Sequence, residues 1–376
     1  MLEGPRQRRG RGGDQMAIGA ARPRQLSRSL DFSGVRIETA RLRSDRAVTT
    51  FWRWWADGGC RRATAAVESG DARRVVPEIT SLVEAIDPGL SWEFVPATAG
   101  GPHRLTVTAA GVPELRGAAR RWLASAPEGD DTWTYADLRE PVRGCAMNFR
   151  DRRLAFDEAE VVVDPGLSRA DITVHHPGFA GLVGADASIA AYLLLDALCG
   201  EEQVETWVGL IRANATAPGD DAVALAELPR ILTELAADNT DELGDPAWQI
   251  LHGDTCNGPM VAVVRVPLVA LSAPEFDRHV AVTVPYTDVE DGGLPGALSL
   301  PGLRDLEDHL VERLEGTGEC VGAESCDGSR LLHFYVDSTT PAHEQLRAAA
   351  GGWDQGEVTV TVTDDPGWRK VQHLRV

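Results

Sequence analysis

The pattern of apolar residues becomes helical at Ala47 and predicts three helices in succession. Phe51, Trp54 and Trp55 recur at helical spacing and form an aromatic face, and Asp57-Gly58-Gly59 then breaks the helix. Two more helices are predicted over 60–69 and 72–86. Aromatic residues at this spacing are more typical of a packed core than of a ligand-binding site.

A strand–strand–helix–strand order follows and then recurs. The pattern first predicts strands at 91–96 and 103–109, a helix at 113–126 and a strand at 132–138. It then predicts strands at 154–163 and 171–176, a helix at 185–199, a strand at 204–213 and a helix near 223–237. The likeness is one of element order, without a repeat in the sequence.

In the last third of the chain, the same order of two strands, a helix and a strand is predicted, followed by further elements. After a polar stretch, 237–246, that is typical of a linker, the pattern predicts strands at 260–271 and 279–286 and a helix at 301–315. It continues with strands at 320–326 and 331–337, a helix at 341–350 and a strand at 357–363. Asp327-Gly328 between two of these strands is a hairpin turn signal.

These elements predict an α+β protein of two or three two-layer sandwich units, with antiparallel sheets and helices on one face. We expect an N-terminal α+β region at 41–240, which can be divided near 141–153, and a ferredoxin-like C-terminal domain at 255–376.

The first 40 residues are rich in Gly and Arg and have no periodicity, so they are expected to be disordered. An idle tail and a true start at Met16 both explain them better than RNA binding does.

The net negative charge of the chain argues against nucleic acids and anionic membranes as partners. The net charge is −20, and residues 1–46 carry 11 Arg against five acids, so the rest of the chain is more acidic still. Only Lys370 is a lysine, which is typical of a GC-rich genome rather than of a binding device. An acidic surface repels phosphate backbones and anionic membranes, so we expect no direct DNA binding and no membrane association.

Cysteines and apolar runs indicate the compartment. The six cysteines are scattered and no secretory signal precedes them, so free thiols in a cytoplasmic protein are expected. The longest apolar run, Ile189–Cys199, is interrupted by Asp196 and is too short to span a bilayer.

Motifs for catalysis, cofactors or metals are not recognisable. His175 and His176 are adjacent on a predicted strand and point to opposite faces, and Cys320 and Cys326 are too far apart along one strand to pair. The 291–296 segment, DGGLPG, lacks the lysine of a phosphate loop. We therefore nominate no catalytic, cofactor-binding or metal-binding residue.

The C-terminal third nevertheless resembles a known family. The segments MVAVVRVPL, DGGLPG, LRDLEDHLVERLEG, CVGAESCDGSRLLHFYVD and TDDPGW together resemble the bacterial domain of unknown function 695. That family resembles the B-type regulators of ribonuclease activity, small acidic α+β proteins that inhibit a ribonuclease by binding it. Asp365, Pro366 and Trp368 match the family's terminal Asp-Pro-x-Trp pattern, for which a capped strand end with a packed Trp is the preferred interpretation.

Two functions stay open. The first is a non-enzymatic regulatory or inhibitory protein that binds a basic protein, which the resemblance suggests is a nuclease or a toxin. The second is an enzyme of unrecognised class with a cleft between the middle and C-terminal units. The oligomeric state does not follow from the sequence.

Overall fold

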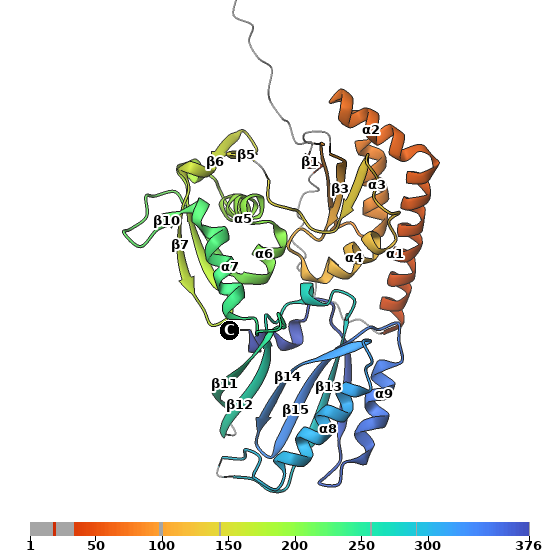
Figure 1. Ribbon diagram of the computed structural model, residues 1–376, viewed down its shortest axis with the longest axis vertical. Helices are drawn as coiled ribbons and strands as arrows, with labels where there is room; N and C mark the ends of the chain where they lie inside the picture. Colours follow the sequence, from red (N-terminus) through yellow and green to blue (C-terminus); the bar gives the residue numbers. More distant parts are fainter. Residues whose placement is uncertain are drawn as a thin grey trace, which may run out of the picture.

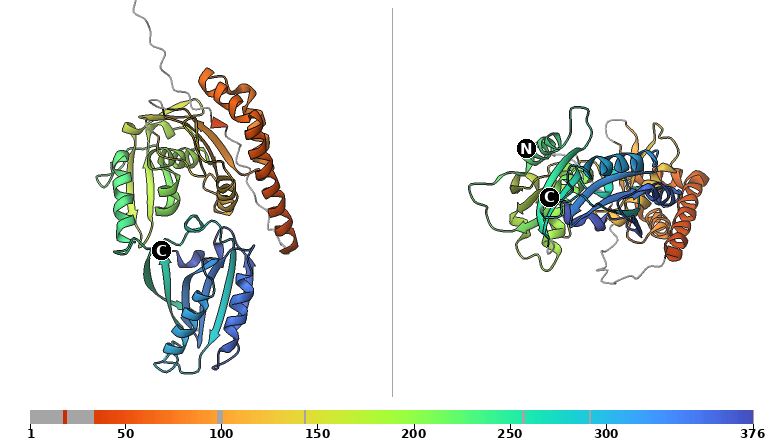
Figure 2. Two further views of the ribbon diagram at one scale, coloured as in Figure 1. Left: turned by 45° about the vertical axis from the view of Figure 1, so that its right-hand side comes forward. Right: turned by 90° about the horizontal axis from the view of Figure 1, so that it is seen from below.

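A computed structural model describes residues 18–19, 34–97, 101–142, 144–255, 258–290 and 292–375. The first two units lie side by side at one end of the molecule, and the C-terminal domain forms the other end (Figures 1 and 2). Of the expected N-terminal tail, Ile18–Gly19 (β1) pairs with β2 (Ser91–Val95), and helix α1 begins at Gly34. The other residues of 1–33 lie outside the described residues.

The first unit packs helices against a small sheet. Besides β1 and β2, its main elements are α1 (Gly34–Trp54), α2 (Cys60–Ser69), α3 (Val76–Ile86), β3 (His103–Thr108), α4 (Arg116–Ala124) and β4 (Trp133–Ala136). The expected break between α1 and α2 is a tight turn, Trp55–Gly59, in which Gly58 has a φ of 109° that side chains rarely adopt. Phe51 and Trp55 are buried, as expected for a core, and pack with Trp122 and Trp133.

The second unit has the same topology. Its main elements are β7 (Glu160–Pro165), β8 (Ala170–His175), α5 (Asp186–Cys199), α6 (Glu201–Trp207), β9 (Val208–Asn214) and α7 (Leu228–Asp238). In both units the first two strands are antiparallel, and a helical connection then leads to a third strand that is parallel to the second. The recurring order is therefore real, although each sheet includes a parallel pair and residues 204–207 are helical rather than extended.

The C-terminal domain has ferredoxin-like topology. Its elements are β11 (Ala247–Thr255), β12 (Gly258–Val266), β13 (Arg278–Pro285), α8 (Leu300–Glu312), β14 (Gly318–Cys326), β15 (Ser329–Val336), α9 (Ala342–Ala349) and β16 (Thr359–Asp364). The strand order β14-β15-β13-β16 is entirely antiparallel, as the ferredoxin-like sandwich requires. The third unit keeps the predicted order of two strands, a helix and a strand along the chain (β12, β13, α8, β14), but its pairing differs from that of the first two units, because β12 pairs with β14 rather than with β13.

Hairpin β11–β12 extends this sheet beyond the ferredoxin-like part. The expected linker at 237–246 is a short turn that leads into β11, a strand that the sequence pattern does not predict. Helices α8 and α9 cover one face of β13, β14 and β15, where Val280, Leu332 and Phe334 are buried. Figure 1 shows that this helical layer ends before β11 and β12.

The opposite face of the C-terminal sheet has its own core. Ala262, Val264 and Tyr335 are buried there beneath the segment that follows β16, which includes Trp368 and ends in the helical turn η9 (Arg369–Leu374). The sheet therefore separates two layers, the helices on one side and the chain end on the other.

Candidate functional site

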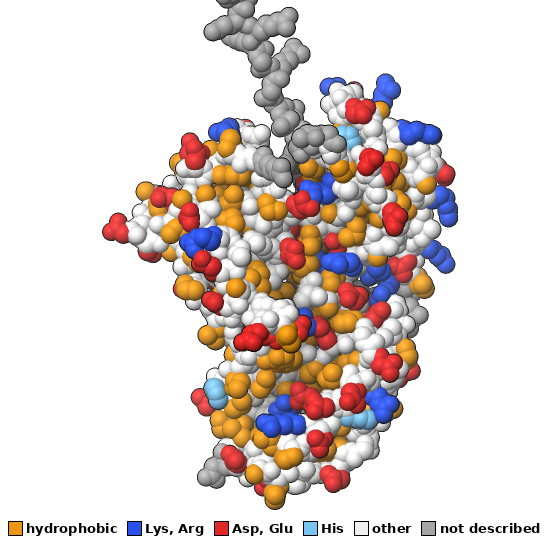
Figure 3. Space-filling model, viewed as in Figure 1, with side chains coloured by type: hydrophobic (Ala, Val, Ile, Leu, Met, Phe, Trp, Pro, Cys, Tyr) orange, Lys and Arg blue, Asp and Glu red, His pale blue; other side chains and the backbone are white. Residues whose placement is uncertain are grey.

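The uncovered part of the C-terminal sheet is an apolar surface. Trp248 and Ile250 on β11 are 49% and 64% exposed, and they lie opposite Arg265 and Val263 of β12. Val263 pairs in turn with Ala323 of the helix-covered core, so the surface belongs to the face on which α8 and α9 lie. Orange side chains gather over β11 and β12 in Figure 3. We call Trp248, Ile250 and Val263 the apolar strip.

The free edge of β11 borders the apolar strip. The strand has a partner on one side alone among the described residues. At the start of the strand, the N–H of Ala247 also donates to the carbonyl of Asn239 at 3.0 Å. At the other end, Thr255 pairs with Gly258, and because Pro259 has no N–H, this pair is the hydrogen-bonded type in which the backbone groups face each other. Because the direction alternates with each residue of an antiparallel strand, the N–H groups of Trp248, Ile250 and His252 point outward. Such a row of unpaired backbone groups can pair with a strand of another protein.

Acidic residues surround this surface. Residues 240–255 contain Asp241, Glu242, Asp245 and Asp254 and have no Lys or Arg. All four acids are exposed. Arg265, the basic residue opposite Trp248, is already paired with Glu319. The edge therefore combines apolar side chains, backbone groups and a negative field.

A hollow lies between the middle unit and the C-terminal residues. It has a volume of about 330 Å³ and is lined by Asp164, Pro165, Gly166, Arg169, Asp171, Gly209 and Arg375. Arg169 donates to the carbonyls of Glu205 (2.7 Å) and Val208, and Arg375 donates to the carbonyls of Gly367 and Trp368, at 3.3 and 3.0 Å. Burial and the neighbouring Arg375 lower the pKa of Arg169 to about 10.

The family-motif positions lie in a buried polar network. Asp365 accepts hydrogen bonds from the Tyr335 hydroxyl (2.6 Å) and from the backbone N–H groups of Arg369 (3.0 Å) and Lys370 (2.8 Å). Trp368 is fully buried, stacks on Tyr335 with ring centroids 4.3 Å apart, and donates to the carbonyl of Phe276. Pro366 is half-buried between them. Asp365 thus caps η9, and Trp368 anchors it.

The other residues considered from the sequence do not converge on a site. His175 bonds to the carbonyl of Thr216 and His176 to that of Ala155, so the two rings serve different segments. Cys320 is buried, which raises the pKa of its thiol to about 12. Asp291 of the 291–296 segment and Cys256 lie outside the described residues.

Sequence reasoning missed two features. One is the apolar strip, since β11 was not predicted. The other is a group of possible metal ligands, Glu324, His333 and His373, on the opposite face of the same sheet. Glu324 and His333 flank the predicted hairpin turn, so their shared face could have been derived from its register, whereas the position of His373 could not.

Known proteins add information on the C-terminal domain alone. No helix in the described ranges is long and apolar enough to cross a membrane. No curated protein and no solved structure matches the chain. Residues 247–374, which run from the first residue of β11 to the last residue of η9, match the model of a family described as "Family of unknown function (DUF695)", and this match confirms the resemblance for the C-terminal third of the chain.

Proposed function

We propose that the chain is a non-enzymatic regulatory protein that binds a basic protein partner through the free edge of β11 and the apolar strip. The observation that carries the proposal is the exposure of Trp248 and Ile250 beside an edge of β11 with which no described strand pairs. Native proteins usually cover or charge such an edge, so an apolar one suggests a binding role.

The chemistry of the edge specifies the partner. An extended segment would pair its backbone with the outward N–H groups of β11 and place alternate apolar side chains on the strip. The acids at 241, 242, 245 and 254 would attract Lys or Arg residues that flank this segment. A tryptophan at the centre of such an interface is a residue type that often contributes much of the binding energy.

The family resemblance suggests a nuclease as the partner class. B-type regulators bind a ribonuclease, and a toxin with nuclease activity would present the same basic surface. Because fold alone does not specify a partner, the partner is sought among all basic proteins of the cell.

The test is capture of partners on the full-length chain at low salt, with a surface variant beside it. Trp248→Asp combined with Ile250→Asp removes the apolar strip and adds charge at exposed positions. We expect a basic protein that the wild-type chain retains and the double variant loses. With that protein purified, the dissociation constant should rise by at least about tenfold in the variant.

Val183→Asp is the matched control, because Val183 is 76% exposed and lies in the middle unit, in the segment before α5. This variant should retain the partner as the wild-type chain does. Equal retention by the double variant would exclude the β11 edge as the binding surface.

An enzyme with its cleft between the middle and C-terminal units is the second candidate. The hollow at that junction is the observation in its favour. Among the described residues, its lining has no histidine, cysteine, serine or lysine, so Asp164 or Asp171 would have to act as the base or nucleophile. Binding is therefore the better-supported function.

A further inference from the structure

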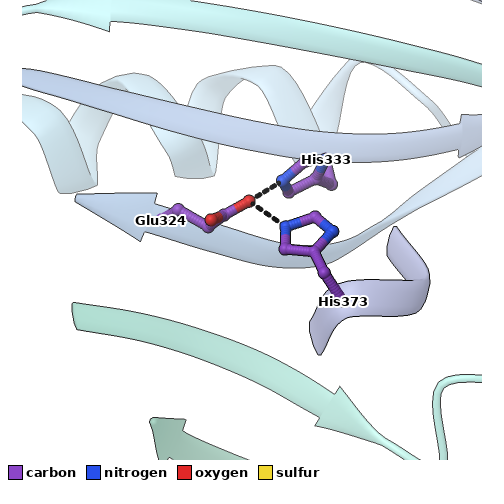
Figure 4. A group of neighbouring side chains, drawn as sticks. All are labelled: Glu324, His333 and His373. Atoms are coloured by element: carbon purple, nitrogen blue, oxygen red, sulfur yellow. Dashed lines mark hydrogen bonds and ion pairs between the residues drawn. The ribbon is translucent and has the colours of Figure 1, made fainter. Parts of the chain in front are cut away.

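Three side chains from separate segments converge on the face of the C-terminal sheet opposite the helices. Glu324 projects from β14, His333 from β15 and His373 from η9, and one ligand atom of each lies within 4.8 Å of the others (Figure 4). The Oε1 atom of Glu324 is 2.7 Å from Nε2 of His333 and 2.9 Å from Nε2 of His373. The group is thus already gathered around one point.

We propose that Glu324, His333 and His373 bind a divalent transition-metal ion of the zinc class. Two imidazoles and a carboxylate are ligands that Zn²⁺ prefers. Three protein ligands leave a further position for water or another donor, as in sites that are not purely structural. This site is independent of the proposed binding surface, because the apolar strip lies on the other face of the sheet.

Burial and access differ among the ligands in a way that suits such a site. His333 is 2% exposed and Glu324 is 9% exposed, so the sheet fixes both. The side chain of His373 is 52% exposed, so an ion can enter from its side without opening the core. A buried carboxylate needs a positive partner, which a bound cation would supply.

The spacing requires a small adjustment. Ligand atoms about 2.1 Å from a tetrahedral zinc ion lie about 3.4 Å apart, somewhat farther than the N···O distances of the unliganded cluster. His373, on an exposed helical turn, can move outward by this amount, and Glu324 can present its second oxygen instead.

A histidine behind the cluster provides the support that metal-binding histidines usually have. The Nε2 atom of buried His279 on β13 is 2.9 Å from Nδ1 of His333. When Nε2 of His333 binds a metal, its Nδ1 carries the proton and can donate it in a hydrogen bond to His279. His279 would therefore fix the ring orientation and tautomer of His333 as a positioning residue.

The family-motif residues position the third ligand. Asp365 caps η9 through two backbone N–H groups, and Trp368 anchors the start of the same turn against Tyr335. His373 lies near the end of this turn. The Asp-Pro-x-Trp pattern thus holds the turn that brings His373 to Glu324, although its residues are not ligands.

Calorimetric titration of the full-length, chelator-treated chain with zinc chloride tests the proposal, together with cobalt chloride as a spectroscopic probe. We expect one ion per chain, and visible cobalt absorption of a site with nitrogen and oxygen ligands. His373→Gln should weaken zinc binding by at least about tenfold, and because the side chain is half-exposed this variant should fold. His279→Gln should weaken binding by about 10- to 100-fold while the stoichiometry stays at one.

His309→Gln on α8 is the control, since this histidine lies on the helical layer on the other side of the sheet. It should bind zinc as the wild-type chain does. Absence of saturable one-to-one binding, or equal zinc affinity in the His373→Gln and wild-type chains, would overturn the proposal and leave the cluster as a hydrogen-bond network.

Discussion

Asp365 connects the core of the C-terminal domain to the turn that carries His373. Its carboxylate accepts three hydrogen bonds, one from a buried tyrosine hydroxyl and two from backbone N–H groups at the start of η9. Among the described side chains, Asp365 is the one that accepts hydrogen bonds from backbone N–H groups of that turn. A single residue therefore links packing, a helix cap and the candidate metal site.

Replacement of Asp365 should be costly for this reason. In Asp365→Ala the Tyr335 hydroxyl and two backbone N–H groups lose their acceptor, so we expect the free energy of unfolding to fall by about 1–3 kcal/mol. Urea unfolding measures this loss. Asp308→Ala is the matched control: Asp308 is an exposed acid on α8, and its loss should change the free energy of unfolding by less than about 1 kcal/mol. Equal costs in the two variants would contradict the capping role.

Most elements follow from local pattern, and the exceptions have physical causes. Helix α2 begins and ends at the predicted residues, and the β14–β15 hairpin turns at Asp327-Gly328 as expected. Strand β11 was missed because apolar residues at 248, 250 and 251 break the alternation that marks a half-buried strand. The solvent-exposed face of β11 carries Trp248 and Ile250, whereas the exposed face of a strand usually carries polar residues.

The candidate metal site can be predicted only in part from the sequence pattern. The register of the β14–β15 hairpin places Glu324 and His333 on one face of the sheet, so the proximity of these two ligands can be predicted from the local sequence. His373 is 49 residues from Glu324 and reaches it because the chain end crosses the back of the sheet. Periodicity does not specify that crossing, which depends on the burial of Trp368 and the cap at Asp365.

The turn between α1 and α2 makes a prediction at the scale of these elements. A Cβ atom at Gly59 would lie 2.7 Å from the carbonyl oxygen and the ring of Trp54, closer than packed atoms allow. Gly59→Ala should therefore displace the helices and lower the unfolding free energy by about 1–3 kcal/mol. At Gly351 a Cβ atom meets nothing within 4 Å, so Gly351→Ala should change stability little. Thermal unfolding of the two variants distinguishes steric strain from a general effect of alanine.

At the scale of the whole molecule, buried charges join the first two units. Arg116, which is completely buried at the start of α4, donates to Glu201 of α6 at 2.6 Å and also pairs with Glu205. Arg139 pairs with Asp196 of α5 at 3.1 Å and with Glu93 of β2 at 3.4 Å. The described network has more carboxylates than arginines, so one acid is expected to hold a proton near neutral pH.

Asp196 is that acid, and it gives the interface a dependence on pH. Burial, and then the charge of Glu201, raise the pKa of Asp196 from 3.8 to about 7 in the folded protein. Between these values the folded state holds a proton that the unfolded state releases, so this contribution to stability is lost as the pH rises from about 4 to about 7. Asparagine imitates the protonated acid at all pH values. In Asp196→Asn the unfolding free energy should therefore fall less steeply over this range than in the wild-type chain.

The slope of the unfolding free energy against pH isolates this effect from the cost of the substitution itself. Asp186→Asn, in the first turn of the same helix, removes a carboxylate that is paired with half-exposed Arg150 and lies outside the network, so it should keep the wild-type slope. If Asp196→Asn also kept that slope, the proton would reside on another acid of the network, such as Glu93 or Glu205, whose pKa values burial also raises. A smaller slope in Asp196→Asn alone would mean that the contact between the first two units weakens as the pH rises through neutrality.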